Sequence, residues 1–237
     1  MKPKVYIDGK EGTTGLQIYD RLAVREDIEL LLIDEEKRKD PAERKKFLNA
    51  ADLVFLCLPD AAAVEAVGLI ENERTRVIDC STAHRTAEGW VYGFPELSGQ
   101  REAIRTAARV ANPGCYATGF LALVRPLVER GALSSKARLA CHALSGYTGA
   151  GKKAIAQYTD PDRDKERESP RHYAVALAHK HLPEMAAMAG LDRPPLFMPM
   201  ICDYPQGMVV TVPLWAEDLE GRWSADSLRA LYEDYYG

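Results

Sequence analysis

Cys115 is the residue best placed in the sequence to act as a nucleophile. It follows a turn-forming Asn-Pro-Gly triplet and precedes a long apolar stretch that predicts a helix. The amides and the dipole at a helix N-terminus stabilise a thiolate and can also form an oxyanion site. The alternative is a buried cysteine with a packing role only, the role that we expect for Cys57, Cys141 and Cys202 in their apolar, strand-like runs.

A thiolate nucleophile needs an acid/base partner, and the chain has only five histidines. The segment HKHLPE contains two of them, His179 and His181, and Pro183 restricts the backbone next to the second. On a regular helix, side chains two residues apart point about 200° apart. We therefore expect only one of the two histidines to face the site, with Glu184 orienting a ring or binding substrate. The alternative is a surface histidine at the start of a helix.

A glycine-rich segment, GKEGTTG, follows the first apolar run and precedes an amphipathic stretch. Gly9, Gly12 and Gly15 are spaced so that backbone amides and the helix N-terminus can hold a pyrophosphate. Thr13 and Thr14 add hydroxyl donors beside the phosphates. The alternative is a tight strand-to-helix connection that needs glycine for backbone reasons alone.

The second apolar run bears on the choice of dinucleotide. It ends at Asp34, where an acidic residue ordinarily holds a ribose 2′-hydroxyl and favours NAD. Lys37, Arg38 and Lys39 follow, and these cations suit a 2′-phosphate or are simply a solvated helix start. The residues leave NAD and NADP both open.

Two polar segments suit an anionic substrate. Ser81, Thr82 and Arg85 follow the fourth predicted strand, at the end where open α/β sheets bind ligands. The loop SGYTGAGKK predicts a phosphate nest, with charge from Lys152 or Lys153. The nest would be formed by Ser145, Thr148 and the amides of Gly146, Gly149 and Gly151. Either segment is otherwise a polar turn.

The elements that must position these residues fall into two domains. In residues 1–113, apolar strands alternate with helices, which predicts a doubly wound, Rossmann-type α/β domain. Its strands are expected at 4–8, 28–34, 52–58 and 76–80, and its helices at 16–23 and 61–70. Residues 114–237 predict an α+β domain that begins with the long helix after the turn, kinked or ended by Pro126. Its other elements are strands near 137–144, 197–201 and 208–215 and helices over HKHLPEMAAMAG and 224–237.

Composition narrows the classes of function. The 237 residues carry a formal net charge of only -4, which disfavours nucleic acid or an anionic membrane as a partner. No apolar run approaches the roughly 18 residues of a membrane span, and the start resembles no signal segment, so we expect a soluble, cytoplasmic protein. The five cysteines form no CxxC pair, so neither a metal site nor a disulfide scaffold is expected.

The ordered motifs GTTG, DCSTAHR, YGFPEL, NPGCYATG, SGYTGAG and HKHLPE resemble the N-acetyl-gamma-glutamyl-phosphate reductase family, in particular the shorter of its two sequence types. The resemblance covers nearly the whole chain. It implies an enzyme of arginine biosynthesis that uses NADPH to reduce N-acetyl-glutamyl 5-phosphate to N-acetyl-glutamate 5-semialdehyde, with release of phosphate. A homo-oligomer, dimer or tetramer, is also expected.

The same resemblance implies roles for individual residues. Cys115 matches the nucleophile that forms a thioester, and His181 matches the acid/base that protonates the thiohemiacetal after hydride addition. The glycine loop with Arg38 is expected to bind the cofactor. The expected substrate residues are Ser81, Arg85, Glu96, Asn112, Ser145, Gly146 and Glu184.

Family members normally continue past the position of Gly237, so the second domain is expected to be C-terminally incomplete relative to the family. Two other functions compete with this one. An enzyme similar to aspartate-semialdehyde dehydrogenase would share the cysteine and the cofactor loop. A non-catalytic NADP-binding sensor would need the glycine loop but not Cys115.

Overall fold

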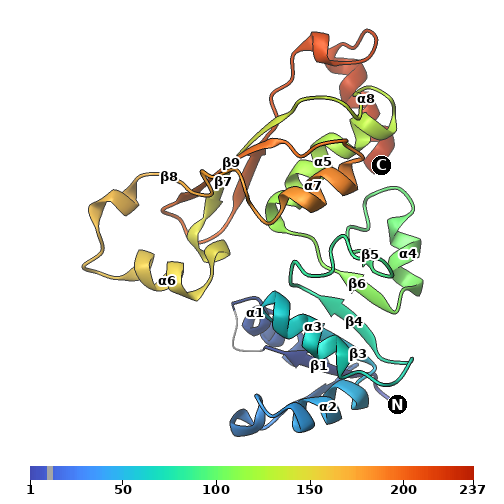
Figure 1. Ribbon diagram of the computed structural model, residues 1–237, viewed down its shortest axis with the longest axis vertical. Coiled ribbons are helices and arrows are strands. Elements are labelled where there is room, and N and C mark those ends of the chain that lie inside the picture. The colour runs from blue at the N-terminus through green and yellow to red at the C-terminus, as the bar shows by residue number, and fades with distance from the viewer. Residues whose placement is uncertain (10–12) are drawn as a thin grey trace. The chain divides into compact units, whose positions relative to one another are not determined.

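The chain divides into two structural units in a computed structural model that describes residues 1–9 and 13–237, with the backbone alone for 13–16 (Figure 1). The first unit holds Met1–Pro95 and Gly99–Pro113, and the second holds Glu96–Ser98 and Gly114–Gly237. The main boundary between the two units falls after Pro113. The short Glu96–Ser98 segment differs because it contacts the second unit, where the Ser98 N–H donates to the Tyr235 hydroxyl at 3.2 Å.

A six-stranded parallel sheet forms the centre of the first unit, which confirms the doubly wound class. Its strand order is β2-β1-β3-β4-β6-β5. The strands are β1 Lys4–Asp8, β2 Glu29–Leu31, β3 Leu53–Leu56, β4 Arg76–Asp79, β5 Val91–Tyr92 and β6 Arg109–Ala111. The order reverses direction at β1, so ligands are expected at the carboxyl ends of β1 and its neighbours.

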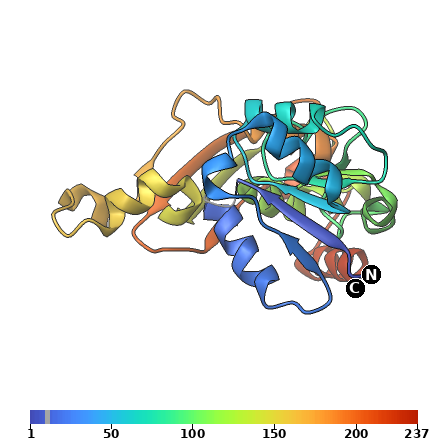
Figure 2. The same ribbon diagram turned by 90° about the horizontal axis from the view of Figure 1, so that it is seen from below.

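Helices cover both faces of this sheet. Figure 2 shows α2 (Pro41–Ala50) and α3 (Asp60–Gly68) on one face and α1 (Thr13–Ala23) on the other, while α4 (Gln100–Thr106) precedes β6. Asp40 starts α2 by accepting the Ala42 N–H at 2.8 Å. Apolar side chains from β1, β3, β4, α2 and α3 form the buried core, among them Tyr6, Leu48, Val54, Leu56 and Val77. Their removal from water stabilises the unit.

The second strand is shorter than predicted. The 28–34 expectation is wrong beyond Leu31, because the chain turns into a short 3-10 helix, η1 (Glu35–Lys37). The Asp34 carboxylate caps that turn by accepting the Glu36 N–H at 3.1 Å. The acidic residue therefore stabilises a turn at this point.

The second unit contains a mixed four-stranded sheet in the order β10-β7-β9-β8. The strands are β7 Ala140–Gly146, β8 Arg171–His172, β9 Leu196–Cys202 and β10 Met208–Thr211. Strands β7 and β9 are parallel, and both outer strands run antiparallel to their neighbours. Cys141, Ala143 and Phe197 are buried on one face. The opposite face of β9 and β10 is open, with exposed Leu196, Met198 and Val209.

The long helix of the second unit is α5 (Cys115–Glu129), which begins at the predicted residue and packs against α7 (Leu182–Ala189). Figure 1 shows α6 (Lys152–Thr159) on an arm that extends from the sheet, and α8 (Ala225–Tyr236) beside α5. Pro126 lies within α5 and removes the N–H that Ala122 would accept. The Tyr236 hydroxyl donates to that Ala122 carbonyl at 2.8 Å. The helix continues past Pro126 for three residues, to Glu129.

Two features are absent from the described residues. No helix there is long and apolar enough to cross a membrane. Within the same residues, no group of three or more histidine, cysteine, aspartate or glutamate side chains is arranged to hold a metal ion.

Candidate active site

Cys115 is the first residue of α5, and its side chain is exposed. Gly114 is the N-cap in extended conformation, so the free amides of the first helical turn lie next to the thiol. Cys141 and Cys202 are buried, as predicted for core residues, whereas Cys57 and Cys80 are half-buried. Cys115 is therefore the cysteine that combines solvent access with a helix N-terminus, a setting that favours the thiolate.

Glu184 holds the turn before Cys115. Its Oε2 accepts the Gly114 N–H at 3.0 Å, and the residue is only 1% exposed. The contact joins the first turn of α7 to the N-cap of α5, two elements 70 residues apart. Glu184 thus holds the backbone directly before Cys115, a role that the sequence did not indicate.

The two histidines lie together, and the expectation that they face opposite ways is wrong. Helix α7 begins only at Leu182, so His179 and His181 lie in the turn before it. Their ring centroids are 4.6 Å apart, and the His181 N–H donates to Nδ1 of His179 at 3.1 Å. Both rings pack against Tyr116, with centroids within 5.9 Å. Both histidines therefore adjoin the residue that follows Cys115.

Hydroxyl groups line the same part of the second unit. The Tyr173 hydroxyl donates to the Tyr116 hydroxyl at 2.8 Å, and Tyr116 also hydrogen-bonds Ser145, a buried residue of β7. Burial raises the pKa of both tyrosines, so they remain protonated near neutral pH. Ser145 thus lies beside Tyr116, the residue that follows Cys115, and its role toward substrate stays a prediction.

Two amides of the predicted phosphate nest in the glycine-rich loop after β7 are already hydrogen-bonded within the protein. The Gly146 N–H donates to the Gly207 carbonyl and the Gly151 N–H donates to the Thr148 carbonyl, each at 3.0 Å. A Cβ at Gly146 would lie 2.7 Å from the Tyr204 carbonyl oxygen, so glycine is needed there for close backbone contact. These two amides stabilise the loop itself, and Lys152 and Lys153 are exposed at the start of α6.

A buried polar cluster lies at the carboxyl end of β4. Asp79 is fully buried and accepts hydrogen bonds from the Ser81 hydroxyl at 2.6 Å and the Ser81 N–H at 2.9 Å. Its Oδ2 also lies 2.6 Å from Nδ1 of His84, whose ring stacks on Trp90. Asp79 therefore fixes the position of Ser81, the predicted substrate residue.

The other predicted substrate residues in this part of the chain are Arg85, Asn112 and Glu96. The buried Arg85 donates to the carbonyls of Asn112 at 3.0 Å and Cys80 at 3.3 Å, which joins β4 to the turn before Cys115. Asn112 is exposed in that turn. Glu96 is exposed, and its charge helps to raise the pKa of Tyr236, an effect that burial dominates. Their roles toward substrate stay predictions.

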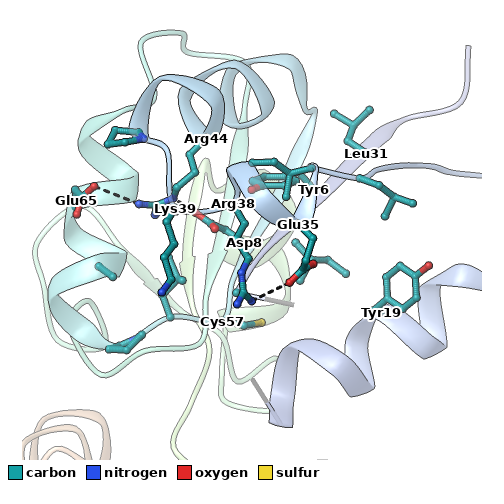
Figure 3. Close-up of a pocket in the computed structure, with 18 of the residues that line it drawn as sticks. Tyr6, Asp8, Tyr19, Leu31, Glu35, Arg38, Lys39, Arg44, Cys57 and Glu65 are labelled. Carbon is teal, nitrogen blue, oxygen red and sulfur yellow. Dashed lines mark hydrogen bonds and ion pairs between the residues drawn. The ribbon is translucent and has the colours of Figure 1, made fainter. Parts of the chain in front are cut away.

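A cavity of about 670 Å³ opens at the carboxyl ends of β1 and β3 in the first unit (Figure 3). Gly9 lines it with φ +88°, and a Cβ there would lie 2.4 Å from the Cys57 carbonyl oxygen. Glycine is therefore required where the loop begins. Figure 3 shows Arg38 and Lys39 extending from the turn after β2, with Arg38 paired to Glu35 at 3.1 Å.

Beneath this cavity, Arg44 is buried between two carboxylates. It donates to Asp8 at 2.9 Å and to Glu65 at 3.2 Å. Burial raises the pKa of Asp8, although the bonds to Arg44 oppose that shift. The network joins β1, α2 and α3, and it fixes the cavity floor.

The remaining cofactor predictions lie partly outside the described residues. Gly12 is one of the residues that the structure leaves undescribed. Thr13, Thr14 and Gly15 belong to the first turn of α1 by their backbone, while their side chains lie outside the description. Helix α1 therefore begins inside the glycine-rich segment, at Thr13, and the role of this segment toward phosphate stays a prediction.

Sequence reasoning missed Asp79, Arg44, Tyr116 and Tyr173. Asp79 could have been singled out from the sequence, because it is a charged residue at the end of an apolar strand. Arg44 lies in the stretch EEKRKDPAERKK, which contains several other lysines and arginines. Nothing in the order of these residues indicates that Arg44 is buried and its neighbours are exposed. The tyrosines lie 57 residues apart, so only the fold brings them together.

Family profiles match both halves of the chain. Residues 14–107 match the family described as "Semialdehyde dehydrogenase, NAD binding domain". Residues 115–237 match "Semialdehyde dehydrogenase, dimerisation domain".

Two curated relatives carry the name N-acetyl-gamma-glutamyl-phosphate reductase. The protein of Trichormus variabilis is 48% identical over 240 residues, which cover 99% of this chain and 74% of the relative. The protein of Brucella ovis is 49% identical over 239 residues, covering 100% of this chain and 77% of the relative.

Solved structures share the fold at low identity. Aspartate semialdehyde dehydrogenase of Francisella tularensis superposes with a TM-score of 0.70 at 12% identity, covering 99% of this chain and 81% of the other. The enzyme of Candida albicans, solved with NADP, gives 0.66 at 13% identity, with coverage of 98% and 76%. These matches establish the same two-domain architecture.

Proposed function

The chain belongs to the N-acetyl-gamma-glutamyl-phosphate reductase family, and we propose from this that it reduces N-acetyl-glutamyl 5-phosphate to N-acetyl-glutamate 5-semialdehyde in arginine biosynthesis. The single observation that carries the proposal is the exposed Cys115 at the start of α5, in a unit where Tyr116 packs against two histidines. An exposed thiol at a helix N-terminus suits acyl transfer.

The first half of the reaction is acyl transfer to Cys115. The thiolate attacks the carbonyl carbon of the acyl phosphate, the C–O bond to phosphate breaks, and a thioester forms. The free amides at the start of α5 stabilise the negative charge that develops on the carbonyl oxygen. Because an acyl phosphate is already activated, the protein mainly orients the reacting groups.

The second half is reduction. Bound NADPH supplies the hydride that converts the thioester to a thiohemiacetal. His181 donates a proton to the thiohemiacetal oxygen as it forms, and accepts it again when the C–S bond breaks to give the aldehyde and the Cys115 thiolate. Glu184 keeps the Gly114 amide, and with it the start of α5, in place throughout.

We assign NADP rather than NAD as the cofactor. Arg38 and Lys39 line the cavity and offer positive charge to a 2′-phosphate. Asp34, the residue that would favour NAD, caps η1 and is absent from the described lining. Gly9 lines this cavity at the end of β1, where a dinucleotide pyrophosphate is expected in this fold.

Neutralising Arg38 should narrow the preference for NADPH over NADH. In Arg38→Gln the NADPH affinity is expected to fall about 10-fold, because one charge-assisted contact to the 2′-phosphate is lost, while NADH is little affected. Equilibrium titration by nicotinamide fluorescence measures both. Lys37→Gln is the matched control, since Lys37 lies outside the described cavity lining. Equal affinities of the unmodified chain for the two cofactors would contradict the assignment.

We also propose that the chain works as a homo-oligomer, dimer or tetramer. The matching profile of the second unit is described as a dimerisation domain. The exposed apolar face of β9 and β10, with Leu196, Met198 and Val209, is the surface that suits a second copy. A reactive thiol and a reduced cofactor fit the cytoplasm, which we propose as its location.

The direct test is the reverse reaction. With N-acetyl-glutamate 5-semialdehyde, NADP and phosphate or arsenate, the purified chain should produce NADPH, followed by absorbance. Omission of phosphate and arsenate should stop the reaction, because the thioester then has no acceptor. Turnover of aspartate semialdehyde in place of the N-acetyl-glutamate compound would favour the aspartate-semialdehyde dehydrogenase alternative instead.

A further inference from the structure

Cys57 and Cys80 lie side by side at the ends of two neighbouring strands. Each directly follows a register pair of the parallel strands β3 and β4, Leu56 and Asp79. The Cys80 N–H donates to the Leu56 carbonyl at 2.9 Å, so the strand pairing extends to the cysteines. Neighbouring strands lie about 4.8 Å apart, within the range of about 4.4–6.8 Å between Cα atoms that a disulfide bridges.

The two thiols belong to adjacent register positions and interact with each other. The interaction lowers the pKa of the Cys80 thiol and raises that of Cys57. The positive charge of Arg85 also favours the Cys80 thiolate. Neither cysteine is fully buried, and Cys57 lines the 670 Å³ cavity (Figure 3). This pair therefore combines a nucleophilic sulfur with an adjacent resolving thiol, Cys57, that reaches a cavity open to small molecules.

We propose that Cys57 and Cys80 are a reversible oxidation site, at which a small disulfide such as glutathione disulfide converts the two thiols into an intramolecular disulfide that weakens dinucleotide binding. The Cys80 thiolate attacks the disulfide and releases one glutathione thiol. Cys57 then attacks the Cys80 sulfur and releases the second. The two cysteines lose two electrons and two protons, and glutathione disulfide becomes two glutathione thiols.

The disulfide affects the cavity through the backbone. The strand spacing of about 4.8 Å already allows the bond, but the disulfide holds the two Cβ atoms about 3.8 Å apart and thereby fixes the orientation of the Cys57 side chain and peptide. Cys57 is followed by Leu58 and Pro59, which line the cavity, and its carbonyl lies against Gly9. A movement of Cys57 therefore changes the cavity wall and the start of the glycine loop. This effect on binding rests on the proposed cofactor site.

The experiment uses the full chain with Cys115→Ala, so that the exposed thiol does not react. The reduced protein is first titrated with NADPH, then incubated with glutathione disulfide and examined by intact mass and non-reducing peptide mapping. We expect a loss of two hydrogens, no retained glutathione, and a peptide linkage between Cys57 and Cys80 that a reductant reverses. The oxidised protein should bind NADPH at least about 5-fold more weakly, a change of about 1 kcal/mol.

The controls carry a second substitution, Cys80→Ala or Cys57→Ala, and should form no internal disulfide. Retained glutathione or unreacted thiols at both positions in the Cys115→Ala chain would overturn the proposal, as would a disulfide that leaves NADPH affinity unchanged. If the reduced chain fails to bind NADPH, the proposed cofactor site is wrong, and the peptide map still decides whether the thiols pair.

Discussion

Replacing Cys115 with serine is expected to abolish reductase turnover while leaving NADPH binding nearly unchanged. A serine hydroxyl is almost entirely protonated near neutral pH and is a poor nucleophile, so the thioester cannot form at a useful rate. The loss should be at least about 10³-fold, the scale on which removal of a catalytic nucleophile acts. Steady-state kinetics give the turnover, and fluorescence titration gives the cofactor affinity.

The matched control is Cys202→Ser, since Cys202 is a buried cysteine of the same unit. It should retain turnover in whatever fraction of the protein folds. Iodoacetamide labelling of the unmodified chain adds an independent measurement, because exposed Cys115 should react before the other cysteines. Retained turnover in Cys115→Ser would refute the thioester mechanism. Ordinary reactivity of Cys115 would instead favour a non-catalytic NADP-binding protein.

Replacing His181 with asparagine should lower turnover by about 10²-fold or more, the contribution of a positioned acid/base. The geometry favours His181 over His179 for this role. Nδ1 of His179 accepts the His181 N–H, so that nitrogen carries no proton while the contact lasts. Protonation of His179 at Nδ1 would break this contact. His181 is buried against Tyr116, next to the nucleophile.

The variant His179→Asn is the matched comparison, because its side-chain oxygen can still accept the His181 N–H. We expect a much smaller loss in this variant than in His181→Asn. His179→Ala removes the acceptor and should cost more than His179→Asn, since the backbone at His181 is then less well held. Turnover of all three variants, with NADPH affinity measured separately, decides the matter. A large loss at His179→Asn with little change at His181→Asn would transfer the acid/base role to His179.

Local patterns in the sequence were sufficient to predict much of the fold. Continuous apolar runs alternating with helices predicted the doubly wound first unit, because strand and helix periodicity are properties of adjacent residues. The Asn-Pro-Gly triplet likewise predicted the start of α5 at Cys115. The sequence left a buried cysteine at this position open, and the structure shows that the thiol is exposed. The family motifs then linked Cys115 with His181 without any knowledge of their positions in space.

Other features depended on pairings between distant segments. Pro126 alone predicted a kink or an end in α5, yet the Tyr236 hydroxyl, 114 residues from Ala122 in sequence, satisfies the carbonyl that the proline leaves. Similarly, the glycine loop after β7 has the composition of a phosphate nest. The Gly146 N–H, however, donates to the Gly207 carbonyl. No local sequence pattern predicts that these two groups are neighbours.

The sequence by itself therefore determined the class of fold, the family and the start of the helix that carries the candidate nucleophile Cys115. The tertiary structure decided which side chains support them: Glu184 on the Gly114 amide, Asp79 on Ser81, and Arg44 between Asp8 and Glu65. It also showed that His179 and His181 share one turn instead of opposite faces of a helix. The physical reason is that helix and strand preferences act over a few residues. Hydrogen bonds and ion pairs between buried groups depend on strand register, helix rotation and the exact end of each element.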